Sequence, residues 1–392
     1  MKSTLAVVIA AALGATLSAS TFSFTPFSVP GALTTAAYGI NNQGQIVGNF
    51  VNATGTHGFV KDGDNFTAFD VPGTAHPQPS GINSSGVIVG AGFGPFGTFG
   101  FLKDGAMFTT LQDPASAGIT IARQINDAGQ IVGTYQADSA PYHGFLLSDG
   151  TYTTIDVPGA QYTLATAINN SGQIVGGFAD ATGTHGFLKD GSQFIVIDVP
   201  GSANAGATGI NKFGEIVGEY DDDSGAHGFL RQGNTLTTFD VPGAFATVPM
   251  GINDAGQIVG YFDGVPGDPF AHGFVTPPVR DIVPPNIRLS VTPNVLWPPN
   301  HKLVEITASV TATDNQDPNP QIALVSVTSN QPANTIGDGN TNPDIVVQNG
   351  RIFVRAERSG DGTDRIYTIT YAATDASGNR ATATATVTVP HS

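Results

Sequence analysis

The sequence predicts an all-β protein in which a six-bladed β-propeller, closed by an N-terminal strand, precedes an Ig-like β-sandwich. Three observations lead to this prediction: a motif that recurs six times, turn residues that divide each recurrence into four short strands, and an abrupt change of texture after residue 278. The 392 residues include 50 glycines and 26 prolines but only 12% charged residues, a composition typical of short strands joined by tight turns.

Residues 1–20 have the features of a secretory signal peptide. Lys2 precedes a short apolar run, and small residues follow it, so we expect cleavage before Thr21. The run is short for a membrane anchor, and no later segment is apolar enough to span a bilayer. We therefore predict a secreted protein, extracellular, periplasmic or on the cell surface, with no membrane insertion.

The motif INxxGxIVG starts each of the six repeats that we expect to form the propeller. Its copies begin at residues 40, 82, 125, 168, 210 and 252. In the fifth copy, ATGIN ends a first strand, and Asn211 and Gly214 suit a tight turn. EIVGEY, AHGFLRQ and LTTFDVPG then provide three more strands. Four strands in about 42 residues are typical of a propeller blade.

The opening stretch TFSFTPFSVPG (21–31) repeats the end of a blade whose beginning is missing. It matches FTAFDVPG (66–73), with Phe24 in the place of Phe66 and Phe27 in the place of Phe69. The sixth copy has three strands and then runs into prolines without such an ending. We expect residues 21–31 to supply its fourth strand and to close a ring over residues 21–278, which removes open sheet edges.

The repeat, with HGF at a fixed distance after INxxGxIVG, resembles the bacterial extracellular HAF repeats, named after a His-Ala-Phe tripeptide that here reads His-Gly-Phe. The resemblance covers residues 21–278. It implies secretion and a repeated β architecture, and it brings no catalytic residues to carry over.

Five repeats carry a histidine on the expected third strand, and Phe99 takes its place in the second repeat. One residue per blade at that position lies away from the axis, so these histidines cannot converge on a metal ion. We predict instead hydrogen bonds within each blade to the aspartates of the DVPG turns. The histidines are His57, His143, His185, His227 and His272, and the aspartates are Asp70, Asp156, Asp198 and Asp240.

Departures from the repeat are better candidates for a binding site, because repetition serves the fold. The channel should be lined by the residues two positions before each Ile-Asn: Tyr38, Ser80, Arg123, Thr166, Thr208 and Met250. Arg123 is the only charged residue among them and suits a carboxylate or a sulfate. The simpler alternative is an ion pair with an acid such as Asp127, or contact with solvent. Phe93 and Phe96, in the loop 91–101, suit stacking on a sugar or packing in the core.

A proline-rich linker (279–286) leads to seven alternating runs that predict an Ig-like sandwich over residues 287–392. The motifs VPPNI, LWPPNHK, GDGNTNPD, RAERSGDG and YAATDASGN resemble a bacterial Ig-like module related to the hyalin-repeat type, which implies an adhesion or spacer role. Trp297, the only tryptophan, either presents its face to a sugar or, as is commoner, anchors the core or an edge.

Oxygen-bearing side chains alternate along the loop of this module that contains Asp338, Asn340, Asn342 and Asp344. That spacing allows oxygen ligands to wrap a calcium ion, and Asp314, Asp317 and Asp375 are further loop carboxylates that can join them. The loop is not an EF-hand, and the alternative is an Asn/Asp-rich turn. Calcium is therefore a possible ligand, and no cofactor is required.

The net charge of −16 and the absence of cysteine exclude several functions. The charge repels phosphate backbones, so we expect no nucleic-acid partner, although acidic surfaces are also ordinary on secreted proteins. Without cysteine there is no disulfide, thiol nucleophile or lipoprotein anchor.

We predict a monomeric, non-catalytic binding or adhesion protein whose propeller loops present a surface to a glycan or to a cell-surface or matrix protein. One alternative is an extracellular carbohydrate-active enzyme, a lyase or hydrolase using Arg123, Tyr38 and a neighbouring acid in the channel. No paired carboxylates or other catalytic motif appear in the sequence, so we assign no catalytic residue. The other alternative is a structural matrix or envelope component that self-associates. The fold alone does not decide among them.

Overall fold

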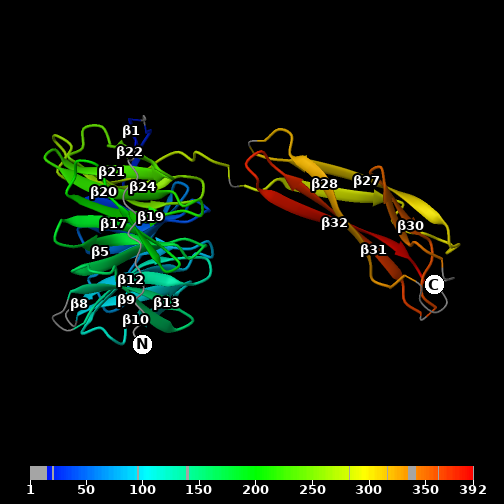
Figure 1. The fold of residues 1–392 in the computed structure, drawn as a ribbon, viewed down its shortest axis with the longest axis horizontal. Helices are drawn as coiled ribbons and strands as arrows, with labels where there is room; N and C mark the ends of the chain where they lie inside the picture. Colours follow the sequence, from blue (N-terminus) through cyan, green and yellow to red (C-terminus); the bar gives the residue numbers. More distant parts are fainter. Residues whose placement is uncertain are drawn as a thin grey trace, which may run out of the picture. The chain divides into compact units, whose positions relative to one another are not determined.

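The computed structural model describes residues 16–19, 22–94, 97–137, 141–281, 283–315, 317–333, 341–360 and 362–391. All helices and strands assigned in these ranges are β-strands, so the all-β prediction is confirmed, and none of the described segments is a helix suited to crossing a membrane. The chain forms two compact units, Met1–Val279 and Arg280–Ser392 (Figure 1).

Unit 1 contains the same antiparallel arrangement of strands several times, and each occurrence corresponds to one of the six sequence repeats. We number the repeats 1 to 6 along the chain. Repeats 1 to 3 contain β3 (Thr34–Ile40), β4 (Ile46–Asn52), β5 (Gly55–Asp62) and β6 (Asn65–Phe69); β7 (His76–Ile82), β8 (Ile88–Gly94), β9 (Gly97–Asp104) and β10 (Met107–Leu111); and β11 (Ile119–Ile125), β12 (Ile131–Gln136), β13 (Tyr142–Ser148) and β14 (Thr151–Ile155). Repeats 4 to 6 contain β15 (Tyr162–Ile168), β16 (Ile174–Ala179), β17 (Thr184–Asp190) and β18 (Gln193–Ile197); β19 (Asn204–Ile210), β20 (Ile216–Asp222), β21 (Gly225–Gln232) and β22 (Thr235–Phe239); and β23 (Ala246–Ile252), β24 (Ile258–Asp263) and β25 (His272–Val275).

Six asparagines connect the repeats into a ring. Each lies at the turn after the first strand of its repeat, which we call the inner strand, and we call this turn the inner turn. The Nδ2 atom of each asparagine donates to the backbone carbonyl of its counterpart in the next repeat, at 3.0–3.4 Å, and Asn253 donates to Asn41. The Oδ1 atom caps its own turn, as in Asn126, which accepts from the backbone N–H groups of Ala128 and Gln130. The members of this asparagine ring are Asn41, Asn83, Asn126, Asn169, Asn211 and Asn253.

The N-terminal fragment adds a strand to repeat 6, as the sequence predicts. Strand β2 (Thr25–Phe27) pairs antiparallel with β25. Phe22 packs against Phe239 with ring centroids 4.5 Å apart, and Phe24 meets Phe274 edge-on at 5.5 Å. The short β1 (Thr16–Ala19) pairs in parallel with β22, while residues 1–15 and 20, the rest of the predicted leader, lie outside the described residues.

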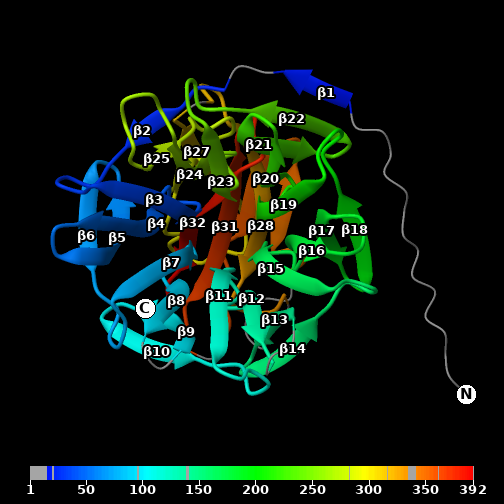
Figure 2. The ribbon, with the colours of Figure 1, turned by 90° about the vertical axis from the view of Figure 1, so that its left-hand side faces the viewer.

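The core of unit 1 lies between neighbouring repeats, around the phenylalanines of the HGF motif. Figure 2 shows the strands of successive repeats following one another around a common centre. Phe229 is fully buried, and its ring lies against Gly218 of the adjacent strand. A Cβ atom at Gly218 would lie 2.5 Å from that ring and 2.1 Å from the carbonyl of Gly206, so the glycine of IVG is required for this close approach.

Unit 2 consists of two sheets around one core. One sheet has the order β26 (Asn286–Thr292), β27 (Leu303–Thr313), β30 (Arg351–Arg355) and β29 (Ile345–Gln348), and the other has β28 (Gln321–Ser329), β31 (Arg365–Thr374) and β32 (Arg380–Val389). Ile306 and Val354 from the first sheet pack with Tyr367 and Val387 from the second. Each of the seven alternating runs in the sequence corresponds to one of these strands.

Candidate functional site

The repeated histidines are bound within their own repeats. The Nδ1 atoms of His57, His143, His185 and His227 lie 2.6–2.9 Å from the carboxylates of Asp70, Asp156, Asp198 and Asp240. His272 lies 2.8 Å from Ser28, which stands where the other repeats have aspartate. The predicted pairs are confirmed, and the repeated histidines are part of the fold.

The space enclosed by the inner turns is narrow at the asparagine ring. Turn residues of all six repeats line a hollow of about 60 Å³ there. A water molecule needs at least about 10–15 Å³ by this measure, so the hollow has room for a few waters and not for a sugar. A larger ligand must therefore approach from the opposite end of the inner strands.

A pocket of about 250 Å³ lies between repeats 4 and 5, toward that opposite end. It extends from Thr166 and Thr208, two of the predicted channel residues, to the strand ends at Tyr162 and Asn204. The remaining lining residues are Leu164, Gly177, Thr184, Ala205, Gly206, Ala207, Glu219, Tyr220 and Asp221.

Two glycines produce this pocket by departing from the repeat. Gly206 stands where the other inner strands have Ala36, Gln78, Ile121, Leu164 and Val248, and Gly177 stands where the other second strands have Asn49, Ala91, Thr134, Glu219 and Tyr261. A Cβ atom at Gly206 would meet no atom within 4 Å, and one at Gly177 only a backbone oxygen at 3.8 Å. Packing therefore does not require these glycines, unlike Gly218.

The polar side chains that line the pocket include those of Tyr162, Asn204, Glu219 and Asp221. Glu219 and Asp221 lie two residues apart on β20 and therefore point to the same side of the strand. Burial raises the pKa of Glu219, and the neighbouring charge of Asp221 raises it further. Within the described residues, neither these carboxylates nor the amide of Asn204 have a side-chain hydrogen bond, whereas Tyr162 lies 3.5 Å from the hydroxyl of Thr184. The pocket thus offers free hydrogen-bonding groups beside an aromatic ring.

The channel residues Tyr38 and Arg123 are brought together, as the enzyme alternative supposed. Burial raises the pKa of the Tyr38 phenol, and the nearby side chain of Gln78 and the charge of Arg123 partly offset this rise. The ring of Tyr38 meets that of Tyr261 at a centroid distance of 6.2 Å. Burial raises the pKa of Tyr261 to about 12, and the nearby charge of Glu219 contributes. Arg123 and the acidic pocket therefore belong to one polar interior.

A larger hollow of about 380 Å³ lies near the start of β2 and the end of unit 1. Its polar lining residue Glu215 already accepts hydrogen bonds from Asn211 and Gln232. It offers fewer free polar groups than the pocket between repeats 4 and 5, which we therefore take as the candidate site.

The predicted aromatic contacts lie in different surroundings. Phe93 is partly exposed (38%), Phe101 is buried in the core, and Phe96 lies outside the described residues. Trp297 is 60% exposed, and the neighbouring Leu296 occupies the core position instead. Trp297 is therefore not a core anchor, which corrects the core half of the preferred interpretation, and an edge position remains a prediction.

The predicted calcium loop is described only in part. Asp338 and Asn340 lie outside the described residues, and Asn342 is described. Asp344 is buried, and its Oδ2 atom accepts a hydrogen bond from the buried Arg365. The carboxylate of Asp344 thus has a structural partner, and the metal site at this loop stays a prediction.

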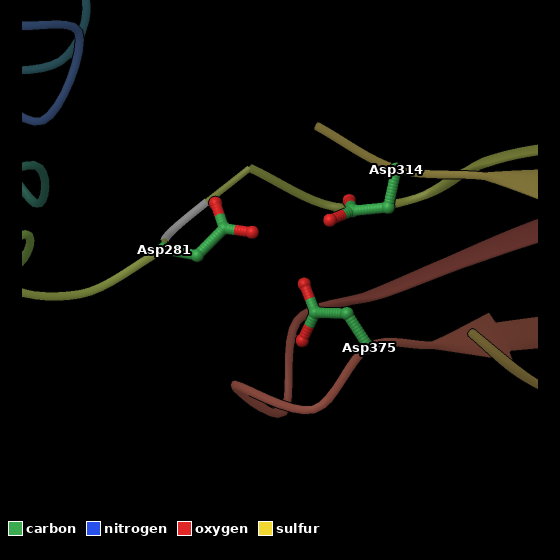
Figure 3. Close-up of side chains that lie close together, drawn as sticks. All are labelled: Asp281, Asp314 and Asp375. Atoms are coloured by element: carbon green, nitrogen blue, oxygen red, sulfur yellow. The ribbon is translucent and has the colours of Figure 1, made fainter. Parts of the chain in front are cut away.

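Three other carboxylates of unit 2 point toward one another: Asp281, Asp314 and Asp375 (Figure 3). One oxygen of each lies within 4.8 Å of the other two, a separation that suits ligands of one calcium ion. Asp314 and Asp375 were among the predicted loop carboxylates. The sequence analysis did not identify Asp281, because it lies in the linker and no other potential ligand stands at a regular spacing from it in the sequence. Asp317 does not belong to this group, and its carboxylate accepts hydrogen bonds from the backbone N–H groups of Asn319 and Ala376.

No family model and no curated protein matches the chain. Among solved structures, it is similar to a putative gluconolactonase (TM-score 0.42, 12% identity, 65% of this chain and 92% of that chain). It is also similar to a catalytically inactive virginiamycin B lyase from Staphylococcus aureus with quinupristin (TM-score 0.42, 12% identity, 66% and 100%). A third is the six-bladed β-propeller Aleuria aurantia lectin, which recognises fucose (TM-score 0.40, 16% identity, 62% and 96%). Similarity this low assigns no activity to the chain.

Proposed function

We propose that this protein is a secreted, non-catalytic binding protein, in which a six-bladed propeller closed by its N-terminal strand holds a saccharide and an Ig-like domain serves attachment or spacing. The observation that carries the proposal is the pocket formed by Gly177 and Gly206, which the repeat does not require. Tyr162 supplies an aromatic face, and Asn204, Glu219 and Asp221 supply hydrogen-bonding groups. This combination suits a sugar ring, with its apolar faces and hydroxyl edges.

The dimensions of the pocket support a small ligand. Its volume of about 250 Å³ is below the range of roughly 300–1,000 Å³ that is common for drug-sized ligands. The narrow end at the asparagine ring is too small for a sugar to pass. We therefore expect a single terminal sugar residue of a glycan, entering from the end opposite the ring.

The test is to fill the pocket with side chains that the sister repeats already carry. Gly206→Val introduces the residue found at Val248, and Gly177→Thr the residue found at Thr134. We expect each to weaken saccharide binding at least about tenfold on a glycan array and by calorimetry, since the added atoms occupy the ligand's space. The thermal midpoint should stay equal or rise slightly, because replacing an unstrained glycine stabilises by about 0.4–1 kcal/mol.

The matched control is Ala36→Val, which enlarges the corresponding position of repeat 1. It should leave binding unchanged. Undiminished binding by folded Gly206→Val and Gly177→Thr proteins would rule out this pocket as the site. If the wild-type protein binds no glycan on the array, a saccharide is ruled out as the ligand.

One observation favours the enzymatic alternative, a glycoside hydrolase or lyase. Because the pKa of Glu219 is raised by burial and by Asp221, this carboxyl group holds its proton more readily, as a general acid requires. If the protein cleaves a saccharide that it binds, Glu219→Gln should abolish product formation, measured by mass spectrometry, while binding persists. A bound saccharide that stays intact with the wild-type protein excludes this alternative.

A further inference from the structure

Arg123 places a positive charge inside the ring of inner strands. Along β11, Thr120 and Ala122 are completely buried within the repeat, whereas Ile121 and Arg123 are half-buried on the opposite side of the strand. Arg123 occupies the same position in its repeat as Thr166 and Thr208, which line the pocket. The backbone of Arg123 therefore lies at the same level of the ring as these two threonines, although Arg123 is not itself among the residues that line the pocket.

The guanidinium group has no hydrogen bond or ion pair within the described part of the chain. Asp127, the expected alternative partner, is bound instead by Ser84 and Asn170. By contrast, Thr166, which occupies the equivalent position of repeat 4, already donates its hydroxyl to the backbone carbonyls of Val175 and Ala207.

Burial lowers the pKa of Arg123, and no carboxylate counteracts it. Arginine nevertheless stays protonated in proteins, and a cation that is partly withdrawn from water without a partner is costly. An anion that reaches Arg123 therefore gains more than it would at the surface.

The groups around Arg123 are hydrogen-bond donors. Burial raises the pKa of Tyr38, so its phenol keeps its proton, and the amide of Gln78 lies beside it. Tyr38, Gln78 and Arg123 come from three consecutive repeats, whereas the acids Glu219 and Asp221 belong to repeat 5. The interior thus has a cationic side and an acidic side, which would orient a charged ligand.

We propose that Arg123, together with Tyr38 and Gln78, binds the oxyanion of an acidic saccharide, a carboxylate or a sulfate group. A planar guanidinium fork binds both groups through two parallel hydrogen bonds. The proposal rests on the proposed function for the saccharide, but the anion site itself does not depend on it.

The experiment compares three sugars that differ in one group, glucose, glucuronate and glucose 6-sulfate, by calorimetry on the full chain at constant ionic strength. We expect one or both acidic sugars to bind about ten- to a hundredfold more tightly than glucose, as a charged hydrogen-bonded pair predicts. Arg123→Gln should remove this preference and leave the affinity for glucose unchanged. Preference for only one acidic sugar identifies the oxyanion.

The control Arg231→Gln makes the same change of charge on β21, the third strand of repeat 5, instead of on the first strand of a repeat. Equal affinity for the three sugars, or equal effects of the two arginine substitutions, would overturn the proposal. If Arg123→Gln does not fold, Tyr38→Phe takes its place and should weaken the preference without removing it.

A second readout separates the anion site from saccharide binding. Sodium sulfate stabilises folded proteins in general because it is excluded from their surface, so the site is measured by the excess over this effect. At equal ionic strength, replacing chloride by sulfate should raise the thermal midpoint of the wild-type protein and of Arg231→Gln more than that of Arg123→Gln. If no sugar binds but this sulfate effect is present, the anion site stands and the saccharide function fails. If neither is seen, both fail.

Discussion

Asp222 shows how one exposed side chain in the turn of repeat 5 contributes to stability. Its carboxylate accepts hydrogen bonds from the hydroxyl and the backbone N–H of Ser224 and from His227. These bonds lower the pKa of Asp222 from 3.8 to about 2. A carboxylate whose pKa is lower in the folded state stabilises the protein above the unfolded pKa, and this contribution is lost as the pH falls through the folded pKa.

We therefore predict that Asp222→Asn lowers the thermal midpoint at pH 5 and that its deficit shrinks as the pH falls below the unfolded pKa of 3.8, with most of it lost near pH 2, the pKa of the folded state. Differential scanning calorimetry across this range measures it. Asp223→Asn, at the exposed neighbouring position, is the control and should have little effect at either pH. The same deficit at pH 5 and at pH 2 would show that the bonds of Asp222 do not depend on its charge.

The inner turns and the strands between them have different tasks. Each asparagine of the ring binds its own turn and the next repeat, and the bond from Asn253 to Asn41 leaves no free end. Because one net hydrogen bond contributes only about 0.5–1.5 kcal/mol, the ring acts through its six bonds together. The inner turns close one end of the interior. Positions on the strands are free to vary between repeats, and the pocket and Arg123 occur at such positions.

Repetition explains which features could be predicted from the sequence. The strand pattern and the histidine–aspartate pairs follow from a period that fixes the alignment of every repeat, and the partner of β25 follows from a missing segment. The same alignment places Tyr38 and Arg123 at one level. The pocket could not be predicted, because it depends on missing side chains at Gly177 and Gly206, on two strands of different repeats. The meeting of Asp281 with Asp314 and Asp375 likewise depends on the path of the linker.

At the scale of the whole molecule, unit 1 depends on a contact between two segments that lie far apart in the sequence, β2 near the N-terminus and β25 of repeat 6. Strand β2 covers the free edge of β25, and Phe22 and Phe24 cover Phe239 and Phe274 of repeats 5 and 6. The circle of repeats is thus completed by residues that precede the first repeat. Stability of unit 1 should therefore depend on this short fragment far more than its length suggests.

A pair of N-terminal truncations tests this dependence. A protein that starts at Phe22 keeps β2, whereas one that starts at Ala32 lacks it. Truncating one core phenylalanine costs about 3–5 kcal/mol, and a domain is stable by only about 5–15 kcal/mol, so losing the fragment should remove most of the stability of unit 1. We expect calorimetry to show one sharp transition of unit 1 for the first protein and none for the second. The transition of unit 2 serves as the internal reference in both. If the protein that starts at Ala32 keeps the transition of unit 1 at an unchanged midpoint, the ring does not need its N-terminal strand.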